Sequence, residues 1–241
     1  MIERFTNRTD FESYADFAAN FKLTIPRDFN FAYDVVDVWA AEEPSREALL
    51  WTNPDGEERR FTFADMKELS DQTASFFQSL GVGKGTRVML MLKRHWQFWP
   101  AMMALHKLGA VAIPATHLLT AEDIEYRCRM ADIKVIVAAG DPDMVEHIEE
   151  ARPRCKSLEW LVSTGPCVPA GWLDFNKGVD GAPAFRRPEK VNSNSDEMLL
   201  YFTSGTSGEP KMVAHDFTYP LGHIVTARFW HNLRPGDIHL T

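Results

Sequence analysis

Short apolar runs alternate along this chain with longer segments whose apolar residues recur at the helical period. The segment 62–80 is the clearest of these, because Thr62 can cap its start and Gly81 stands where a helix-ending glycine belongs. The apolar runs predict strands at 48–51, 59–63, 88–92, 111–114, 135–138, 158–162 and 198–202. The helical patterns predict helices at 31–41, 62–80, 96–108, 120–130, 142–151 and 219–230. Regular alternation of this kind predicts an α/β fold, with a mostly parallel sheet flanked by helices.

Turn-forming residues interrupt this pattern in three places. Residues 53–56 read Asn-Pro-Asp-Gly and predict a hairpin turn between the first two strands. Residues 165–194 are rich in proline, glycine and asparagine, which predicts an irregular connection with a short helix near Trp172. Residues 235–237 read Pro-Gly-Asp and predict a turn, after which residues 238–241 resemble a strand that has only begun. We therefore divide the chain into an N-terminal α/β subdomain, 1–190, and the start of a following segment, 191–241.

The segment 201–212 reads Tyr-Phe-Thr-Ser-Gly-Thr-Ser-Gly-Glu-Pro-Lys-Met and follows an apolar strand. Glycine lets the backbone take positive φ, so that successive N–H groups can turn inward around an anion. Hydroxyl groups add donors, and lysine adds a compact positive charge. The segment therefore predicts a phosphate-binding loop made of Thr203, Ser204, Gly205, Thr206, Ser207, Gly208 and Lys211.

The loop does not fit the Walker A pattern of GTPases and many ATPases. That pattern requires Ser or Thr directly after the lysine and a helix that starts there, whereas Met212 follows Lys211 here. Pro210 also disfavours helical geometry at Glu209. A flexible surface turn is the plain alternative, but few such turns combine an apolar strand with this order of residues.

The order Thr-Ser-Gly-Thr-Ser-Gly-x-Pro-Lys closely resembles the phosphate loop of AMP-forming acyl-CoA synthetases, members of the adenylate-forming superfamily. Met212 stands where most of the family has glycine, and the continuation through His215 looks like the medium-chain acyl-CoA synthetase branch. Residues 60–66, 81–88 and 107–114 resemble further segments of the family, in the same order. The resemblance covers nearly the whole chain and implies an incomplete N-terminal portion of the large domain of such an enzyme.

The resemblance also implies an activity. The family activates a carboxylic acid with ATP to an acyl-AMP and then transfers the acyl group to coenzyme A, using Mg²⁺. Its enzymes are about twice this length, and their adenine-binding motif, metal-binding glutamate and catalytic lysine would follow residue 241. We therefore expect no catalytic residue and no metal ligand within this chain, and we expect the C-terminal half of the enzyme to be absent from it.

The composition of the chain limits which classes of partner and which cellular compartment we expect for it. The 241 residues are 45% hydrophobic and 25% charged, and their net charge of −8 disfavours nucleic acid as a partner. No apolar run is long enough for a membrane span, and the first residues show no signal-peptide pattern. Three cysteines without a C-x-x-C pair suit a reducing cytoplasm. We expect a small-molecule carboxylate and coenzyme A as partners; a homo-oligomer stays open.

The other candidate residues give weaker indications of a functional site. Four histidines recur every eight residues from His215 to His239, but eight residues turn a helix ~80° past two full turns, so they share no face. No metal site is expected from them. His215 is a candidate substrate-proximal residue, with a structural histidine as the favoured alternative. Asp34 with Asp37, and Asp141 with Asp143, are interpreted as solvated or capping residues.

Four hypotheses follow. The first is a fatty-acyl-CoA synthetase, and the second is an adenylate-forming enzyme with another acceptor, such as a carrier protein or an oxidative luciferase-like reaction. The third is a folded fragment without activity of its own. The fourth is a nucleoside triphosphatase, which would release orthophosphate and no pyrophosphate. Met212 and its neighbours favour the first.

Overall fold

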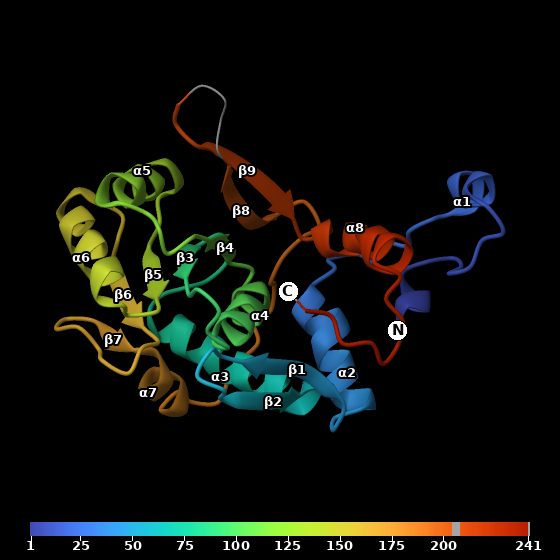
Figure 1. The fold of residues 1–241 in the computed structure, drawn as a ribbon, viewed down its shortest axis with the longest axis horizontal. Coiled ribbons are helices and arrows are strands. Elements are labelled where there is room, and N and C mark those ends of the chain that lie inside the picture. The colour runs from blue at the N-terminus through green and yellow to red at the C-terminus, as the bar shows by residue number, and fades with distance from the viewer. Residues whose placement is uncertain (204–207, 241) are drawn as a thin grey trace.

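The computed structural model describes residues 1–203 and 208–240. Within them, seven strands form one sheet in the order β7-β6-β5-β3-β4-β8-β9 (Figure 1). All neighbours in this sheet are parallel except β8 and β9, which are antiparallel. The predicted α/β class and the mostly parallel sheet are confirmed. The strands are β3 Arg87–Met91, β4 Val111–Pro114, β5 Val135–Ala138, β6 Trp160–Ser163, β7 Leu173–Asp174, β8 Glu197–Thr203 and β9 Lys211–Asp216.

A separate antiparallel hairpin joins β1 Glu47–Thr52 to β2 Glu58–Thr62, as the turn at 53–56 predicted. Helices cover both faces of the large sheet, with α5 and α6 on one face and α3, α4 and α7 on the other (Figure 1). The α-helices are α1 Tyr14–Asn20, α2 Asp37–Glu42, α3 Phe63–Ser79, α4 Phe98–Leu108, α5 Ala121–Ala131, α6 Pro142–Ala151, α7 Phe175–Asp180 and α8 Tyr219–Val225. Short turns of other helix types are η1 Ile2–Arg4, η2 Ala32–Val36, η3 Arg152–Arg154 and η4 Thr226–Trp230.

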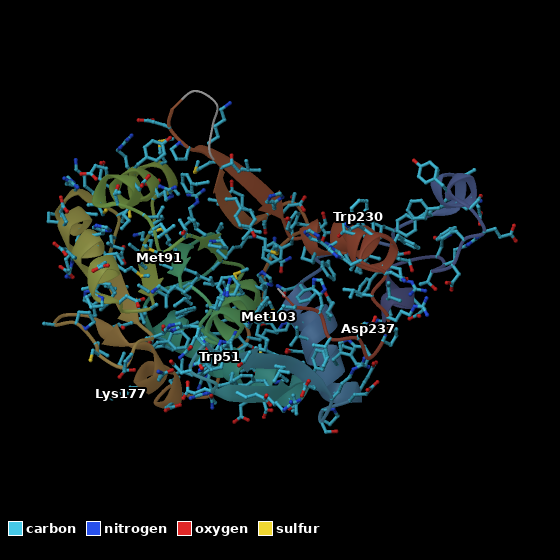
Figure 2. All side chains as sticks on the ribbon, in the orientation of Figure 1. Trp51, Met91, Met103, Lys177, Trp230 and Asp237 are labelled. Carbon is cyan, nitrogen blue, oxygen red and sulfur yellow. The ribbon has the colours of Figure 1, made fainter. Side chains whose placement is uncertain are left out.

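The sheet divides two apolar cores, and β3 supplies both. Val88 and Leu90 pack with α3, α4 and α7, whereas Met89 and Met91 pack with α5 and α6. Successive strand residues point to opposite faces, so an unbroken apolar run is what a strand covered on both sides requires. Figure 2 shows Met91 inside this layer, whereas Trp230 protrudes from η4 and is 82% exposed.

The helix starts follow the polar residues that precede them. Thr62 and Thr120 each cap a helix through a reciprocal capping box, with Asp65 and Asp123 respectively. The predicted helices at 62–80 and 120–130 are therefore confirmed, with bounds shifted by a residue. The pattern at 31–41 forms η2 followed by α2, so its first part is a wider helical turn than expected.

Two predicted elements differ from the structure. Residues 238–240 form no strand in the described part of the chain, and Ile238 and Leu240 are 76% and 92% exposed. A strand forms only where a neighbouring strand accepts its backbone hydrogen bonds, and none lies beside this segment among the described residues. Near Trp172, the helix α7 begins three residues later, after the two residues of β7.

The segment before β8 is fastened to the rest of the fold by buried amides. Asn30 donates to Asn192 at 2.8 Å and to the His106 carbonyl at 2.7 Å. Gly109 ends α4 with φ of 65°, and a Cβ there would lie 2.3 Å from the Val191 carbonyl oxygen. Only glycine permits both the positive φ and this close approach. The connection at 165–194 is thus held against the α/β layers directly before the sheet continues. The predicted division at residue 190 stays a prediction.

His106 is buried between aromatic rings, and neither of its ring nitrogens has a hydrogen-bond partner among the described residues. Burial lowers the pKa of His106 to about 4. An unfolded histidine titrates near pH 6.5, so the unfolded chain binds the extra proton between these two values. Stability contributed by the neutral ring is therefore complete above pH 6.5 and is lost as the pH falls toward 4.

We expect the His106→Phe variant to lose this pH dependence. As the pH falls from 6.5 to 4, the free energy of unfolding of the parent should decrease by on the order of 3 kcal/mol more than that of the variant. Urea denaturation of the complete gene product at several pH values measures the difference. The exposed His231, changed to Gln, is the matched control and should keep the parental slope. Equal slopes for His106→Phe and the parent would contradict the prediction.

Candidate phosphate-binding site

The predicted phosphate loop joins two strands that lie side by side. β8 ends at Thr203, and β9 begins at Lys211 directly opposite it in the antiparallel register. The Thr203 hydroxyl donates to the Lys211 carbonyl at 3.4 Å. Ser204, Gly205, Thr206 and Ser207 lie outside the described residues. The structure thus brings the two ends of the loop together, at the end of a projecting hairpin (Figure 1).

Gly208 has φ of 111°, a value that residues with a Cβ rarely adopt. This matches the reason for which glycine was expected in the loop, since positive φ lets consecutive N–H groups face one side. Lys211 is exposed at the start of β9. Gly208 and Lys211 therefore have the backbone freedom and the accessible charge that anion binding requires.

Helix α5 contacts the hairpin on both sides of the loop, at Phe202 near the end of β8 and at Pro210 directly before β9. Tyr126 donates its hydroxyl to the Pro210 carbonyl at 2.9 Å, and its ring lies edge-on to Phe202, with centroids 6.3 Å apart. The Arg127 guanidinium lies 5.2 Å from the centre of the Phe202 ring. Sequence patterns alone did not reveal the role of Tyr126 and Arg127. Tyr126 is 84 positions from Pro210, and the only signal for both residues was their place on a predicted helix.

The structure places His215 away from the loop end. It lies four residues after Lys211, a distance of about 14 Å along β9. Its ring packs against Tyr219, with centroids 4.0 Å apart, and lies edge-on to Tyr201 at 5.9 Å. Burial raises the pKa of Tyr201 above its ordinary value. His215 thus sits in an aromatic stack with the contacts of a structural histidine, and a role near a substrate stays a prediction.

A groove of about 1,410 Å³ runs along the carboxyl ends of the parallel strands. Its walls come from the β1–β2 turn and from residues 92–98, 114–117 and 164–166. Since β8 is parallel to β4, the phosphate loop leaves the sheet at the same edge. The order of the strands also reverses here, because β4 and β5 lie on opposite sides of β3. Ligands of open α/β sheets bind outside the carboxyl ends at such a point.

The described residues hold neither a cluster of metal-ligating side chains nor a membrane-spanning helix. Within 1–203 and 208–240, no group of three or more His, Cys, Asp or Glu side chains could hold a metal ion. These residues therefore offer no side-chain cage for the Mg²⁺ that the resemblance implies. In this part of the chain, no helix combines the length and apolar character needed to span a bilayer.

Comparison with known proteins identifies the family. Residues 36–240 match the model of a family described as AMP-binding enzyme. The chain belongs to the AMP-binding enzyme family. The acyl-coenzyme A synthetase ACSM3, mitochondrial, of Homo sapiens is 34% identical over 243 residues and the protein of the same name from Pongo abelii is equally similar. The mouse protein ACSM5 is 33% identical over 221 residues. The resemblance read from the phosphate loop and its flanks is confirmed.

Each match covers most of this chain but a smaller share of the relative. The two ACSM3 alignments cover 96% of this chain and 41% of the relative, so the chain spans about two fifths of their length. The solved structure of the anthranilate CoA ligase AuaEII, in complex with anthranoyl-AMP, is 26% identical with a TM-score of 0.71, over 86% of this chain and 38% of that one. An acyl-CoA synthetase of Brucella canis reaches a TM-score of 0.75 at 22% identity, over 87% and 37%, which shows the shared fold.

Proposed function

We propose that this AMP-binding chain takes part in the activation of a carboxylic acid by ATP, and that residues 203–211 bind the nucleotide phosphates. The observation that carries the proposal is the hairpin itself. It holds Thr203 and Lys211 opposite each other across a glycine-rich segment, at the carboxyl-end edge of the sheet along which the groove also runs. The 26%-identical ligase in complex with anthranoyl-AMP, an acyl adenylate, supports the same chemistry.

The chemical need for ATP follows from the carboxylate. Its leaving group would be oxide, which departs poorly, so a free acid is a weak acyl donor. Attack of a carboxylate oxygen on the α-phosphorus of ATP forms the acyl–AMP bond and releases pyrophosphate. The thiol of coenzyme A then attacks the acyl carbon, forms the thioester and releases AMP. The enzyme's task in the first step is to stabilise the charge that gathers on the leaving pyrophosphate.

The loop residues suit that task by their chemistry. Backbone N–H groups and hydroxyls from Thr203 to Gly208 would donate to the β- and γ-phosphate oxygens, and Lys211 would add a positive charge beside them. Donors of this kind stabilise developing charge best where a protein holds them in place before the reaction. We assign no acid, base or nucleophile to this chain, and coenzyme A is proposed as the acceptor because the similar synthetases are named for it.

The test is an acid-dependence assay on the complete gene product. We expect exchange of labelled pyrophosphate into ATP that requires an added carboxylic acid, measured with a panel of straight-chain, branched and aromatic acids. Adding coenzyme A should then produce AMP and an acyl thioester in equal amounts. Orthophosphate release without pyrophosphate would contradict the proposal and indicate a triphosphatase instead.

Two further comparisons separate the alternatives. Thioester formation on a carrier protein, with coenzyme A inert, would favour an adenylate-forming enzyme with another acceptor. Acid-dependent AMP release by residues 1–241 alone would exclude the alternative of a folded fragment without activity. The cytoplasmic location, the absence of a nucleic-acid partner and the oligomeric state stay predictions.

A further inference from the structure

One turn of helix α5 contacts the hairpin on both sides of the proposed phosphate loop. The Tyr126 hydroxyl donates to the Pro210 carbonyl at 2.9 Å, directly before β9. The neighbouring Arg127 guanidinium and the Tyr126 ring both lie against Phe202, one residue before the end of β8. The contacts therefore fix the hairpin at the two positions from which the loop departs.

The hydrogen bond from Tyr126 acts on the peptide group that begins Lys211. The carbonyl of Pro210 and the amide nitrogen of Lys211 belong to one planar unit, so holding the oxygen also sets the direction of the chain at Lys211. The proline ring fixes the φ angle on the preceding side, and the pairing of Thr203 with Lys211 restrains the following side. With Tyr126, this peptide is restrained from three directions.

Tyr126 stands on a rigid support. The reciprocal capping box of Thr120 and Asp123 fixes the start of α5, and Asp123 also holds Arg127 through its backbone and side-chain oxygens, at 2.9 and 3.1 Å. Ile124 and Cys128, on either side of Tyr126 in sequence, are fully buried in the core beneath the helix. The Tyr126 hydroxyl therefore projects from a helix that is anchored to the core.

We propose that Tyr126 is a positioning residue that sets Lys211 for contact with the nucleotide phosphates. The inference rests on the proposed function, because it assumes that Lys211 meets ATP. Tyr126 itself would touch neither the nucleotide nor the acid. Its hydroxyl acts on the reaction only by orienting the peptide between Pro210 and Lys211.

The decisive variant is Tyr126→Phe, which removes the hydroxyl and keeps the ring on Phe202. In pyrophosphate exchange by the complete gene product, we expect the KM for ATP to rise about 3- to 10-fold, the effect of one hydrogen bond, while the KM for the acid changes less than 2-fold. Tyr33→Phe is the matched control, because the Tyr33 hydroxyl also donates to a main-chain carbonyl, that of Lys107, at 3.0 Å. It should leave the KM for ATP unchanged.

A double-mutant cycle with Lys211→Ala tests the route of the effect. If Tyr126 acts through Lys211, then Tyr126→Phe should change the KM for ATP less than 2-fold once the lysine side chain is gone. The full 3- to 10-fold increase in that background would overturn the proposal. So would equal increases in Tyr126→Phe and Tyr33→Phe, since these would reflect a general loss of stability.

A measurement without activity separates failure of this inference from failure of the proposed function. Amide hydrogen exchange of residues 211–216 should be about 3- to 10-fold faster in Tyr126→Phe than in the parent or in Tyr33→Phe. Unchanged exchange there would overturn the positioning role even if the parent shows no pyrophosphate exchange. A parent that lacks exchange of pyrophosphate, while the amides respond as expected, would overturn the proposed function alone.

Discussion

Replacing Lys107 with methionine should lower the free energy of unfolding by about 3 kcal/mol, the lower end of the range for breaking a buried ion pair. The Lys107 side chain is fully buried and its ammonium lies 2.8 Å from Asp37 and 2.6 Å from Asp71. Burial raises the pKa of Asp37, and the nearby ammonium opposes that shift. Without the lysine, two carboxylates would stay together in a poorly solvated site. The side chains of Asp37 and Asp71 remain 18% and 23% exposed, so we expect a loss of stability at the lower end of that range.

Urea denaturation of the complete gene product at pH 7 measures this effect, and the chain offers a matched control. Lys134 also pairs with a carboxylate, that of Glu159, but both side chains are about half exposed. Lys134→Met should change the unfolding free energy by less than about 1 kcal/mol. Adding Asp37→Asn and Asp71→Asn to Lys107→Met should recover part of the loss, because the stranded charges are then removed. Equal effects at Lys107 and Lys134 would contradict the prediction.

The Lys107 cluster illustrates what the sequence could not supply. The residue stands in an apolar helical pattern, and its partners lie 70 and 36 positions earlier in the chain. Asp37 was interpreted as a solvated or capping residue, and in the structure it is an ion-pair partner in the interior instead. Periodicity reports that a helix face is buried, but it does not report which distant carboxylate meets a buried ammonium.

Local signals predicted the central elements well. The bounds of β4, β5 and α6 follow from apolar runs ended by glycine or proline and from a helix that opens on Pro142. β9 was not predicted, because the apolar run within Lys211–Asp216 is only three residues long, at 212–214. It is a strand only because its backbone pairs with β8, and that pairing is a tertiary fact.

The loop at 203–211 is the part of the candidate site for which the sequence carried a signal, since its residue types follow from the chemistry of anion binding. Its binding of phosphate stays a prediction, and the structure describes the geometry of its flanks. Thr203 and Lys211 meet across the hairpin, and Gly208 has the positive φ that motivated glycine there. The support from Tyr126 and Arg127 depends on how α5 packs, so no local pattern could reveal it.

The largest effect on activity is expected at Thr206, in the middle of the loop. Thr206→Val removes one hydroxyl donor and keeps the size and branching of the side chain. If that hydroxyl stabilises charge on the leaving pyrophosphate, the barrier should rise by about 2.7–4 kcal/mol, the cost of removing one donor from a comparable oxyanion site. We therefore expect kcat/KM for ATP in pyrophosphate exchange to fall about 100- to 1,000-fold, with an unchanged unfolding midpoint.

Thr24→Val is the matched control. It is the same substitution at an exposed threonine outside the loop. It should keep kcat/KM within 2-fold of the parent. The way the loss at Thr206 divides between kcat and KM also distinguishes two roles of the hydroxyl. A donor that acts on ATP in the ground state and the transition state alike would raise KM and spare kcat, whereas a donor to developing charge lowers kcat as well. A change below 2-fold in both constants would remove Thr206 from the site, and the loop's phosphate contacts would then have to come from its backbone amides and Lys211.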